Sequence, residues 1–285
     1  MNVMKKLAWR IRLLRATVGL HGKMVVLAAY FVHLSLKITG RHSGSFDQTL
    51  ANATAFLRNT MLRFGDTKVV ILDWDTLAMF SPFWESFMPL WFTPRLGDVV
   101  LDIGANVGKY TMKASRMVGE LGRVIAIEPH PTNYDILLRN IGLNELRNVS
   151  VLNLAAWKAD CKLELFGGDT SGHHSSKRNR HLGSIVVRDR SMDHILAELG
   201  VKDVAWIKID VEGSEPEVLV GLNRTIRSSR PRIIVEIFSE NLPSVKSSMK
   251  DANYDLVAIS QVEGVAGLSS QYFFLVPLSR DQTEN

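Results

Sequence analysis

The stretch Val99–Thr111, VVLDIGANVGKYT, decides the fold of this chain. Its first apolar residues suit a buried parallel strand, and Gly104 and Gly108 permit a tight turn and a close backbone approach before a helix. A dinucleotide-binding loop would have the pattern G-x-G-x-x-G and hold a pyrophosphate at the helix N-terminus, but here the pattern is Asp102-x-Gly104-x-Asn106-x-Gly108. The loop therefore predicts no phosphate cradle, and the acid at the strand end suits a cationic or amine-bearing ligand.

A second acid follows one helix later, in Val124–Pro131, VIAIEPHP. Glu128 ends this predicted strand, 26 residues beyond Asp102. An acid roughly 20 residues past the glycine loop of a βαβ unit is placed to accept both hydrogen bonds of a ribose diol. Either acid alone would also suit capping of the helix that follows it. Together, at strand ends one unit apart, they favour a binding site.

A third segment, Trp206–Gly221, has the sequence WIKIDVEGSEPEVLVG and passes from a strand into a helix. Together with DIGANVGKYT, IEPHP, LLRNIGLN, NLAAW and RPRIIVEI, in this order, it resembles the FkbM family of S-adenosylmethionine (SAM)-dependent methyltransferases. The resemblance covers roughly residues 85–277. It implies an α/β fold with a doubly wound, mostly parallel, seven-stranded Rossmann-like methyltransferase sheet, SAM as the cofactor and methyl transfer as the activity.

The strand ends and the resemblance together indicate a cofactor site. Asp102 suits the amine of the methionine part of SAM, and Glu128 suits the ribose. Glu85 matches a glutamate that the family often has ahead of the glycine loop. By resemblance, a turn at Ala155 and Ala156 lies beside the adenine, where a bulky side chain would clash. The predicted cofactor-binding residues are Glu85, Asp102, Gly104, Ala105, Asn106, Gly108, Tyr110, Thr111, Glu128, Pro129, Ala155 and Ala156.

The predicted catalytic residues are Asp210, Glu212 and Lys208. Methyl transfer from a sulfonium is an in-line displacement, for which the enzyme aligns donor and acceptor while a base removes the proton of an attacking alcohol. Asp210 is the best candidate for that base or for an acceptor anchor. Lys208 shares its strand face and can steady the carboxylate, whereas Glu212 equally suits the helix N-terminus. A magnesium-assisted variant with Asp210 and Glu236 as ligands is a less favoured alternative, so no metal is predicted.

The sequence at residues 210–213 indicates which kind of atom accepts the methyl group. Amino-methylating nucleic-acid enzymes usually have an Asn/Asp-Pro-Pro-aromatic turn where this chain has Asp-Val-Glu-Gly. The difference favours an oxygen acceptor, and the resemblance implies O-methylation of a hydroxyl on a sugar, glycan, lipid-linked saccharide or secondary metabolite, with no nucleic-acid partner. Two alternatives stay open: a noncatalytic SAM-binding protein, and a nicotinamide-dependent oxidoreductase, which should have the G-x-G-x-x-G that this chain lacks.

Length and composition fit one large domain with an extension, because 285 residues with 46% hydrophobic content can bury a sizeable core. Cys161 is the only cysteine, so no intramolecular disulfide can form. With no convincing secretory signal, we expect a cytoplasmic protein. The predicted domains are a basic helical extension, residues 1–65, and a methyltransferase domain, residues 66–285. Within the latter, residues 66–96 roof the cofactor site and residues 97–280 form the Rossmann-like core.

The positive charge of the chain is concentrated in the N-terminal extension. Residues 1–66 contain ten lysines and arginines against two acids, a net charge of +8, whereas the remainder has −3. Residues 4–18 have helical apolar spacing, and Met24–Leu36 is an apolar run of 13 residues, short of the roughly 20 needed to span a bilayer. Two interpretations stay open: a helical subdomain packed on the core or on a second subunit, and peripheral attachment of residues 1–42 to an anionic membrane. The sequence does not indicate an oligomeric state.

Strands and helices alternate downstream, as a doubly wound sheet requires. We expect a third strand over Val149–Leu154, and a hairpin of Lys162–Phe166 with Ser184–Arg188. By resemblance, the last strand of the sheet is antiparallel. The polar, histidine-rich segment 167–183 between the hairpin strands favours a solvated loop over a substrate lid.

Overall fold

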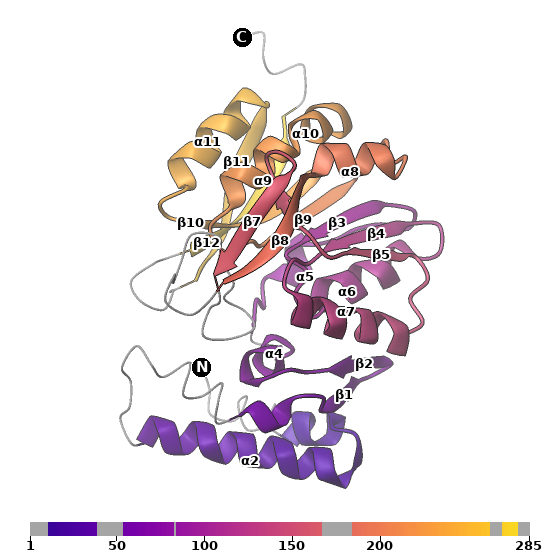
Figure 1. Ribbon diagram of the computed structural model, residues 1–285, viewed down its shortest axis with the longest axis vertical. Coiled ribbons are helices and arrows are strands. Elements are labelled where there is room, and N and C mark those ends of the chain that lie inside the picture. Colours follow the sequence, from indigo (N-terminus) through magenta and orange to yellow (C-terminus); the bar gives the residue numbers. More distant parts are fainter. Residues whose placement is uncertain (1–10, 39–53, 83, 167–183, 263–269, 279–285) are drawn as a thin grey trace.

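The computed structural model describes residues 11–38, 54–82, 84–166, 184–262 and 270–278. Its centre is a sheet of seven strands with helices on both faces (Figure 1). The strands are β3 (Val99–Ile103), β4 (Arg123–Ile127), β5 (Val149–Leu152), β9 (Trp206–Ile209), β10 (Arg232–Phe238), β11 (Tyr254–Val262) and β12 (Ser270–Pro277). Their order is β11-β12-β10-β9-β3-β4-β5, and β12 alone runs antiparallel to both of its neighbours. The predicted doubly wound α/β class and the antiparallel last strand are confirmed.

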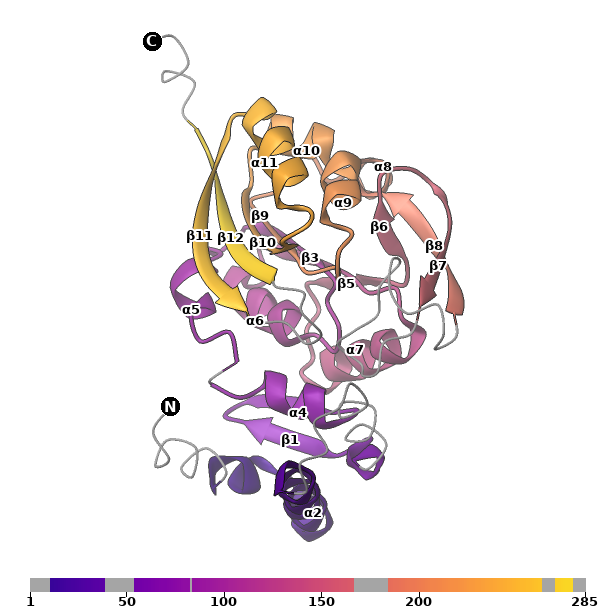
Figure 2. The same cartoon turned by 90° about the vertical axis from the view of Figure 1, so that its left-hand side faces the viewer.

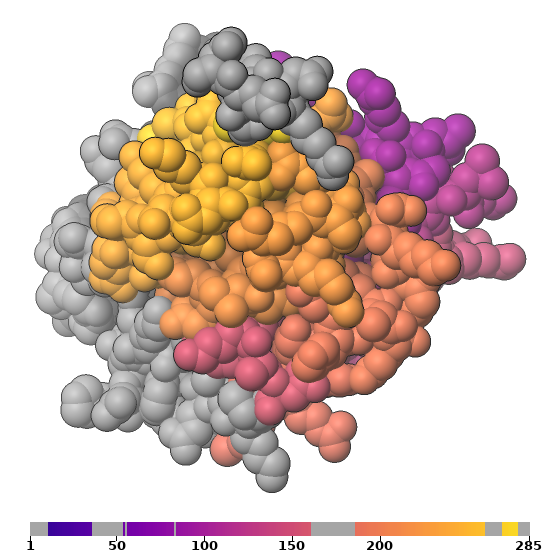
Figure 3. All heavy atoms as spheres, turned by 90° about the horizontal axis from the view of Figure 1, so that it is seen from above, coloured from indigo at the N-terminus to yellow at the C-terminus, as the bar shows by residue number. Residues whose placement is uncertain are grey.

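The helices form a layer on each face of this sheet (Figure 2). One layer contains α8 (Met192–Glu198), α9 (Glu215–Gly221), α10 (Asn223–Ser229) and α11 (Leu242–Asp251). The other contains α5 (Met88–Trp91), α6 (Lys109–Val118) and α7 (Pro131–Leu143). Residues of the C-terminal half cover the end of the molecule that is seen from above in Figure 3.

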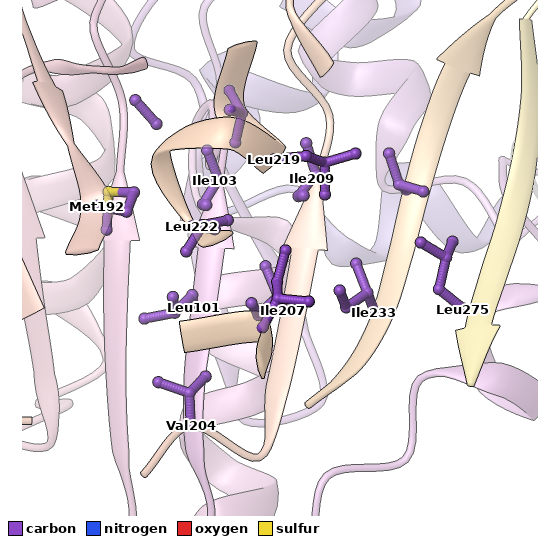
Figure 4. Packing of buried hydrophobic residues seen from close by; sticks show 14 of the residues in the cluster. Leu101, Ile103, Met192, Val204, Ile207, Ile209, Leu219, Leu222, Ile233 and Leu275 are labelled. Carbon is purple, nitrogen blue, oxygen red and sulfur yellow. The ribbon is translucent and has the colours of Figure 1, made fainter. Parts of the chain in front are cut away.

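The central strands are apolar on both sides because each faces a helical layer. Leu101, Ile103, Ile207 and Ile209 point to one side, where they pack with side chains of α8 and α9 (Figure 4). Trp206 points to the other side and packs against the α5–α6 layer. This alternation places Lys208, two residues after Trp206, on the α6 side of β9.

A second, three-stranded sheet lies beside the core, with the order β6-β8-β7. Its strands are β6 (Ala155–Trp157), β7 (Cys161–Phe166) and β8 (Ser184–Ser191), and the β7–β8 pairing confirms the predicted hairpin. The turn predicted at Ala155 and Ala156 is wrong, because these residues pair with Asp189 and Arg190 as a strand. The third strand of the main sheet accordingly ends at Leu152. The histidine-rich segment 167–183 lies outside the described residues.

The N-terminal part contains α2 (Gly19–Ile38), η1 (Ala55–Leu57), a hairpin of β1 (Met61–Phe64) with β2 (Thr67–Val70), and α4 (Trp74–Met79). Val26 and Ala29 of α2 share one apolar cluster with Leu62 of the hairpin and Met112 of α6. The helical extension is thus packed on the core through the hairpin. The predicted boundary at residue 65 divides this hairpin, because β1 lies before it and β2 after it. None of the helices within the described ranges combines the length and apolar character that crossing a bilayer requires.

Candidate active site

The carboxyl ends of β3 and β9 meet at the glycine loop. Ile103 lies opposite Ile209 in parallel register, and the backbone N–H of Asp210 donates to the carbonyl oxygen of Ile103 at 3.0 Å. Gly104 has φ 76°, and a Cβ there would lie 1.8 Å from the carbonyl oxygen of Asp210. Only glycine therefore permits this contact between the two strand ends.

Lys208 is the buried cation of the site, with 3% of its side chain exposed. Its Nζ donates to Asp210 Oδ2 at 3.2 Å and to the carbonyl oxygen of Gly104 at 3.4 Å, and it lies 3.7 Å from Asp102 Oδ1. Burial lowers the pKa of Lys208, but Asp210 and then Asp102 raise it more, so that the net shift is upward. Lys208 therefore stays charged and holds one oxygen of Asp210, whose side chain is 24% exposed. This is the Lys208–Asp210 contact that the strand pattern predicts.

Asp102 and Thr111 are both wholly buried beneath the loop. Asp102 Oδ2 accepts a hydrogen bond from Thr111 Oγ1 at 2.5 Å, while Oδ1 has no hydrogen-bond partner among the described residues. Burial raises the pKa of Asp102, and Lys208 lowers it in part. Because neither side chain reaches the surface, the geometry favours a supporting role for this pair over the predicted direct contact with a cofactor.

Glu85 joins the same cluster from the segment before α5. Its carboxylate accepts hydrogen bonds from Lys109 Nζ at 2.9 Å, Tyr110 Oη at 2.5 Å and Tyr272 Oη at 2.5 Å. Burial raises the pKa of Glu85, but Lys109 and Lys208 lower it more, so the net shift is downward. Glu85 is therefore a stable anion beside the two lysines, in the region where the sequence predicts a roof.

Glu236 lies on β10, in register with Tyr272 of β12. Its Oε1 accepts a hydrogen bond from Ser270 Oγ at 2.5 Å. Burial and then the charge of Asp210 raise the pKa of Glu236 well above its ordinary value. The charge of Asp210 therefore disfavours ionisation of Glu236. Among the described residues, no group of three or more His, Cys, Asp or Glu side chains is arranged to hold a metal ion.

Glu128 lies on the other side of the glycine loop and is 5% exposed. Its oxygens accept backbone hydrogen bonds from Asn106 at 2.8 Å and from His130 at 2.9 Å. Burial raises the pKa of Glu128 to about 7, against the lowering effect of these two bonds. The bond from Asn106 joins the carboxyl end of β4 to the loop that follows β3. Both strand ends can therefore contribute to one ligand site.

The other predicted cofactor residues occupy several different positions. Ala105 and Tyr110 are nearly buried, and Gly108 (φ 94°) caps the N-terminus of α6. The carbonyl oxygen of Pro129 accepts a hydrogen bond from Asn153 Nδ2 at 3.0 Å. Ala156 packs in the core cluster beneath α8 and α9, away from a free turn.

The start of α9 is held by Glu215 and not by the side chain of its N-cap residue. Glu212 has a left-handed backbone (φ 51°) and is half-buried, and the side chain of the N-cap residue, Ser214, makes no capping hydrogen bond. Instead, Glu215 accepts hydrogen bonds from the Gly213 backbone and from Asn241 Nδ2, both at 2.7 Å. Burial raises the pKa of Glu215 to about 7. Glu215 therefore fixes the turn that carries Glu212.

The sequence patterns do not predict Lys109 and Tyr272 as members of the cluster around Glu85. Lys109 follows Gly108 directly, and its position in the first turn of α6 is the signal that could have found it. Tyr272 can be found only from the β10–β12 register, which the sequence does not specify.

Comparison with known proteins gives the family of this fold and site. Residues 102–256, more than half of the chain, match the model of the methyltransferase FkbM domain. The chain belongs to the FkbM methyltransferase family. The match begins at Asp102 and includes Glu128 and the Lys208–Asp210 pair. The family predicted from the sequence motifs is confirmed.

Individual relatives of this FkbM protein are distant. It is 25% identical over 191 residues to methyltransferase sdnD of Sordaria araneosa, which covers 55% of this chain and 73% of that protein. It is 28% identical over 141 residues to the hexuronic acid methyltransferase AglP of Haloferax volcanii, covering 49% of this chain and 56% of AglP. The crystal structure of methyltransferase FkbM from Methylobacillus flagellatus matches with a TM-score of 0.47 at 15% identity, covering 95% of this chain and 59% of that one.

Proposed function

We propose that this FkbM-family protein transfers a methyl group from SAM to a hydroxyl oxygen on a sugar, glycan, lipid-linked saccharide or secondary metabolite. Family membership supports methyl transfer. The name of the relative AglP, a hexuronic acid methyltransferase, supports a sugar acceptor. The Asp-Val-Glu-Gly sequence at residues 210–213 supports an oxygen acceptor.

The charges around the glycine loop fit SAM, which carries a sulfonium and an ammonium. Asp102 and Asp210 lie beside Lys208, Glu85 pairs with Lys109, and the buried Asp102 Oδ1 lacks a hydrogen-bond partner among the described residues. These three acids outnumber the two lysines, so a cationic ligand would balance the charge of the site. SAM when bound supplies a methyl group on a positively charged sulfur. Glu128 would hold its ribose, and Glu85 and Asp102 would favour its cationic end.

Asp210 is the residue that we assign to the acceptor, and one observation carries this assignment. Asp210 is 24% exposed, while Lys208, Asp102 and Glu85 are at most 10% exposed. Its Oδ2 is held by Lys208, so Oδ1 is the oxygen that would take the proton of the attacking hydroxyl. Lys208 is then a positioning residue that fixes the carboxylate, and Glu212 is a second acid that lines the acceptor side.

The test is methyl transfer from isotope-labelled SAM to a library of hydroxyl-bearing acceptors. We expect turnover with the wild-type protein and loss of turnover in Asp210→Asn with SAM binding retained. Binding without turnover on any acceptor would favour a noncatalytic SAM-binding protein. Protection against heat by NAD(H) rather than SAM would favour the oxidoreductase alternative.

We also propose that α2 attaches the protein peripherally to an anionic membrane. Its outer side carries a stripe of exposed apolar side chains at helical spacing: Leu20, Met24, Leu27, Phe31 and Leu34. Val26 and Ala29 on the opposite side pack on the hairpin, so the stripe can contact a partner without unfolding. The exposed Lys23 and the net charge of +8 over residues 1–66 complement anionic lipid head groups better than a second copy of this basic segment.

A further inference from the structure

A basic pocket of about 790 Å³ lies between the N-terminal segment, the β1–β2 hairpin and α6. None of the described residues that line it is acidic, and its cations are Arg12, Arg15, Arg63, Lys109, Lys113 and Arg116. The volume is within the range of about 300–1,000 Å³ that small-molecule sites have. Neither the glycine loop nor the Asp210 cluster contributes to this lining, apart from Lys109 at their border.

Few acidic side chains among the described residues form ion pairs with the cations of this pocket. Within the described part of the chain, Lys109 alone forms an ion pair, with Glu85. Arg63 donates to the carbonyl oxygen of Gly65 at 3.1 Å, and Lys113 makes no hydrogen bond or ion pair with a described residue. Burial and, second, the positive charge of Lys109 lower the pKa of Lys113. The neighbouring positive charges of the pocket therefore repel each other. A bound anion would remove this repulsion.

The arrangement brings two basic helix faces to one space. Lys109, Lys113 and Arg116 have i, i+4 and i+7 spacing in α6 and therefore share one face of that helix. Arg12 and Arg15 have i, i+3 spacing in the helical residues 11–16. Guanidinium groups bind phosphate oxygens in bidentate geometry, and lysines add point charge, so this mixture suits a phosphate with several oxygens.

We propose that the basic pocket binds a phosphate-bearing group, a phosphomonoester or a diphosphate, that is part of the methyl acceptor. Lys109 lines the pocket and donates to Glu85 in the candidate active site, so a ligand bound here lies beside that site. The placement of the phosphate on the acceptor rests on the proposed function, whereas phosphate binding itself does not. Attached to a sugar or lipid, such a group would anchor the acceptor while its hydroxyl is presented to Asp210.

The experiment measures binding of inorganic pyrophosphate to the full-length protein by calorimetry. Arg63→Gln/Lys113→Gln removes two pocket cations whose side chains support no other element. Lys246→Gln/Lys250→Gln on α11 is the control, because it removes the same charge from exposed positions outside the pocket. We expect the pocket variant to bind pyrophosphate about tenfold or more weakly and the control to match the wild type.

SAM affinity is measured on the same samples, and it should not change in the pocket variant. If pyrophosphate binds in the pocket and SAM does not bind the wild type, the proposed function fails and the phosphate site stands. No pyrophosphate binding by the wild type, or equal losses in both double variants, would overturn the proposal.

A second arm identifies the source of the phosphate. Phosphatidate-containing vesicles are offered with and without pyrophosphate. Release of the protein by pyrophosphate, together with weaker vesicle binding of the pocket variant, supports a lipid-borne phosphate. If both double variants bind the vesicles equally well and only the pocket variant loses pyrophosphate binding, the result supports a soluble phosphorylated acceptor.

Discussion

The assignment of Glu128 to the cofactor ribose predicts a pH-dependent affinity for SAM. Burial raises the pKa of Glu128 to about 7 in the free protein. Ribose hydroxyls donate hydrogen bonds, so they bind the ionised carboxylate better than the protonated one. With a pKa near 7 and binding to the ionised form only, the dissociation constant should be about eightfold larger at pH 6.0 than at pH 7.5.

The assay is calorimetry of SAM binding at these two pH values. Glu128→Gln keeps the size of the side chain but cannot ionise, so its affinity should lose the part of the pH dependence that Glu128 causes. At pH 7.5 the variant should also bind SAM about 1 to 3 kcal/mol more weakly than the wild type, the usual loss for a charge-assisted hydrogen bond.

Glu215→Gln is the matched control, because the pKa of Glu215 is also raised to about 7 by burial while the side chain fixes the start of α9. This variant should retain the wild-type ratio of the two dissociation constants. Titration of the amino group of SAM affects all three proteins equally. The reasoning is refuted if Glu128→Gln keeps the wild-type ratio, or if Glu215→Gln is the variant that loses it.

Three further predictions concern catalysis, stability and the membrane. Asp210→Asn should keep SAM affinity and lower turnover by about 10²-fold or more, and unchanged turnover in a labelled-methyl assay would reject its role as base. Because the folded-state pKa of Glu215 is raised from 4.5 to about 7, its contribution to stability is complete below pH 4.5 and is lost as the pH rises through 7, by up to about 3 kcal/mol. The melting temperature of Glu215→Gln should therefore fall less between pH 5 and pH 8 than that of the wild type, and an equal fall would contradict the raised pKa. Leu27→Gln/Phe31→Gln should weaken salt-sensitive co-sedimentation with anionic liposomes, whereas Leu90→Gln/Leu121→Gln, at exposed positions elsewhere, should not; equal binding by both would rule out the α2 stripe.

The sequence predicts the main sheet because its strands are continuous apolar runs that end in polar residues. Lys208 and Asp210 illustrate this, since strand alternation places both on one face and the structure joins them by a hydrogen bond. The Ala155–Ala156 segment shows the limit of such reasoning. Small residues are compatible with a turn or a strand, and the pairing with β8, 30 or so residues later, decides between them.

Long-range contacts account for what the sequence does not predict in the site. Whether Asp102 lies at the surface of the loop or beneath it depends on the packing of Thr111 and Lys208 around it. Tyr272 reaches Glu85 across 187 positions of the chain, and no local pattern specifies that contact. The basic pocket likewise depends on three segments meeting, so charge counting locates the excess in the extension without revealing a shared cavity.

The central claim is that this protein methylates a hydroxyl oxygen with Asp210 as the base. The most direct measurement is mass spectrometry of glycans and polar lipids from cells that lack the gene and carry either the wild-type protein or Asp210→Asn. The account predicts a species with one additional methyl-group mass, located on oxygen by fragmentation, in the wild-type cells and its unmethylated form in the variant cells. Identical spectra from the two strains, or a methyl group located on nitrogen, would contradict it.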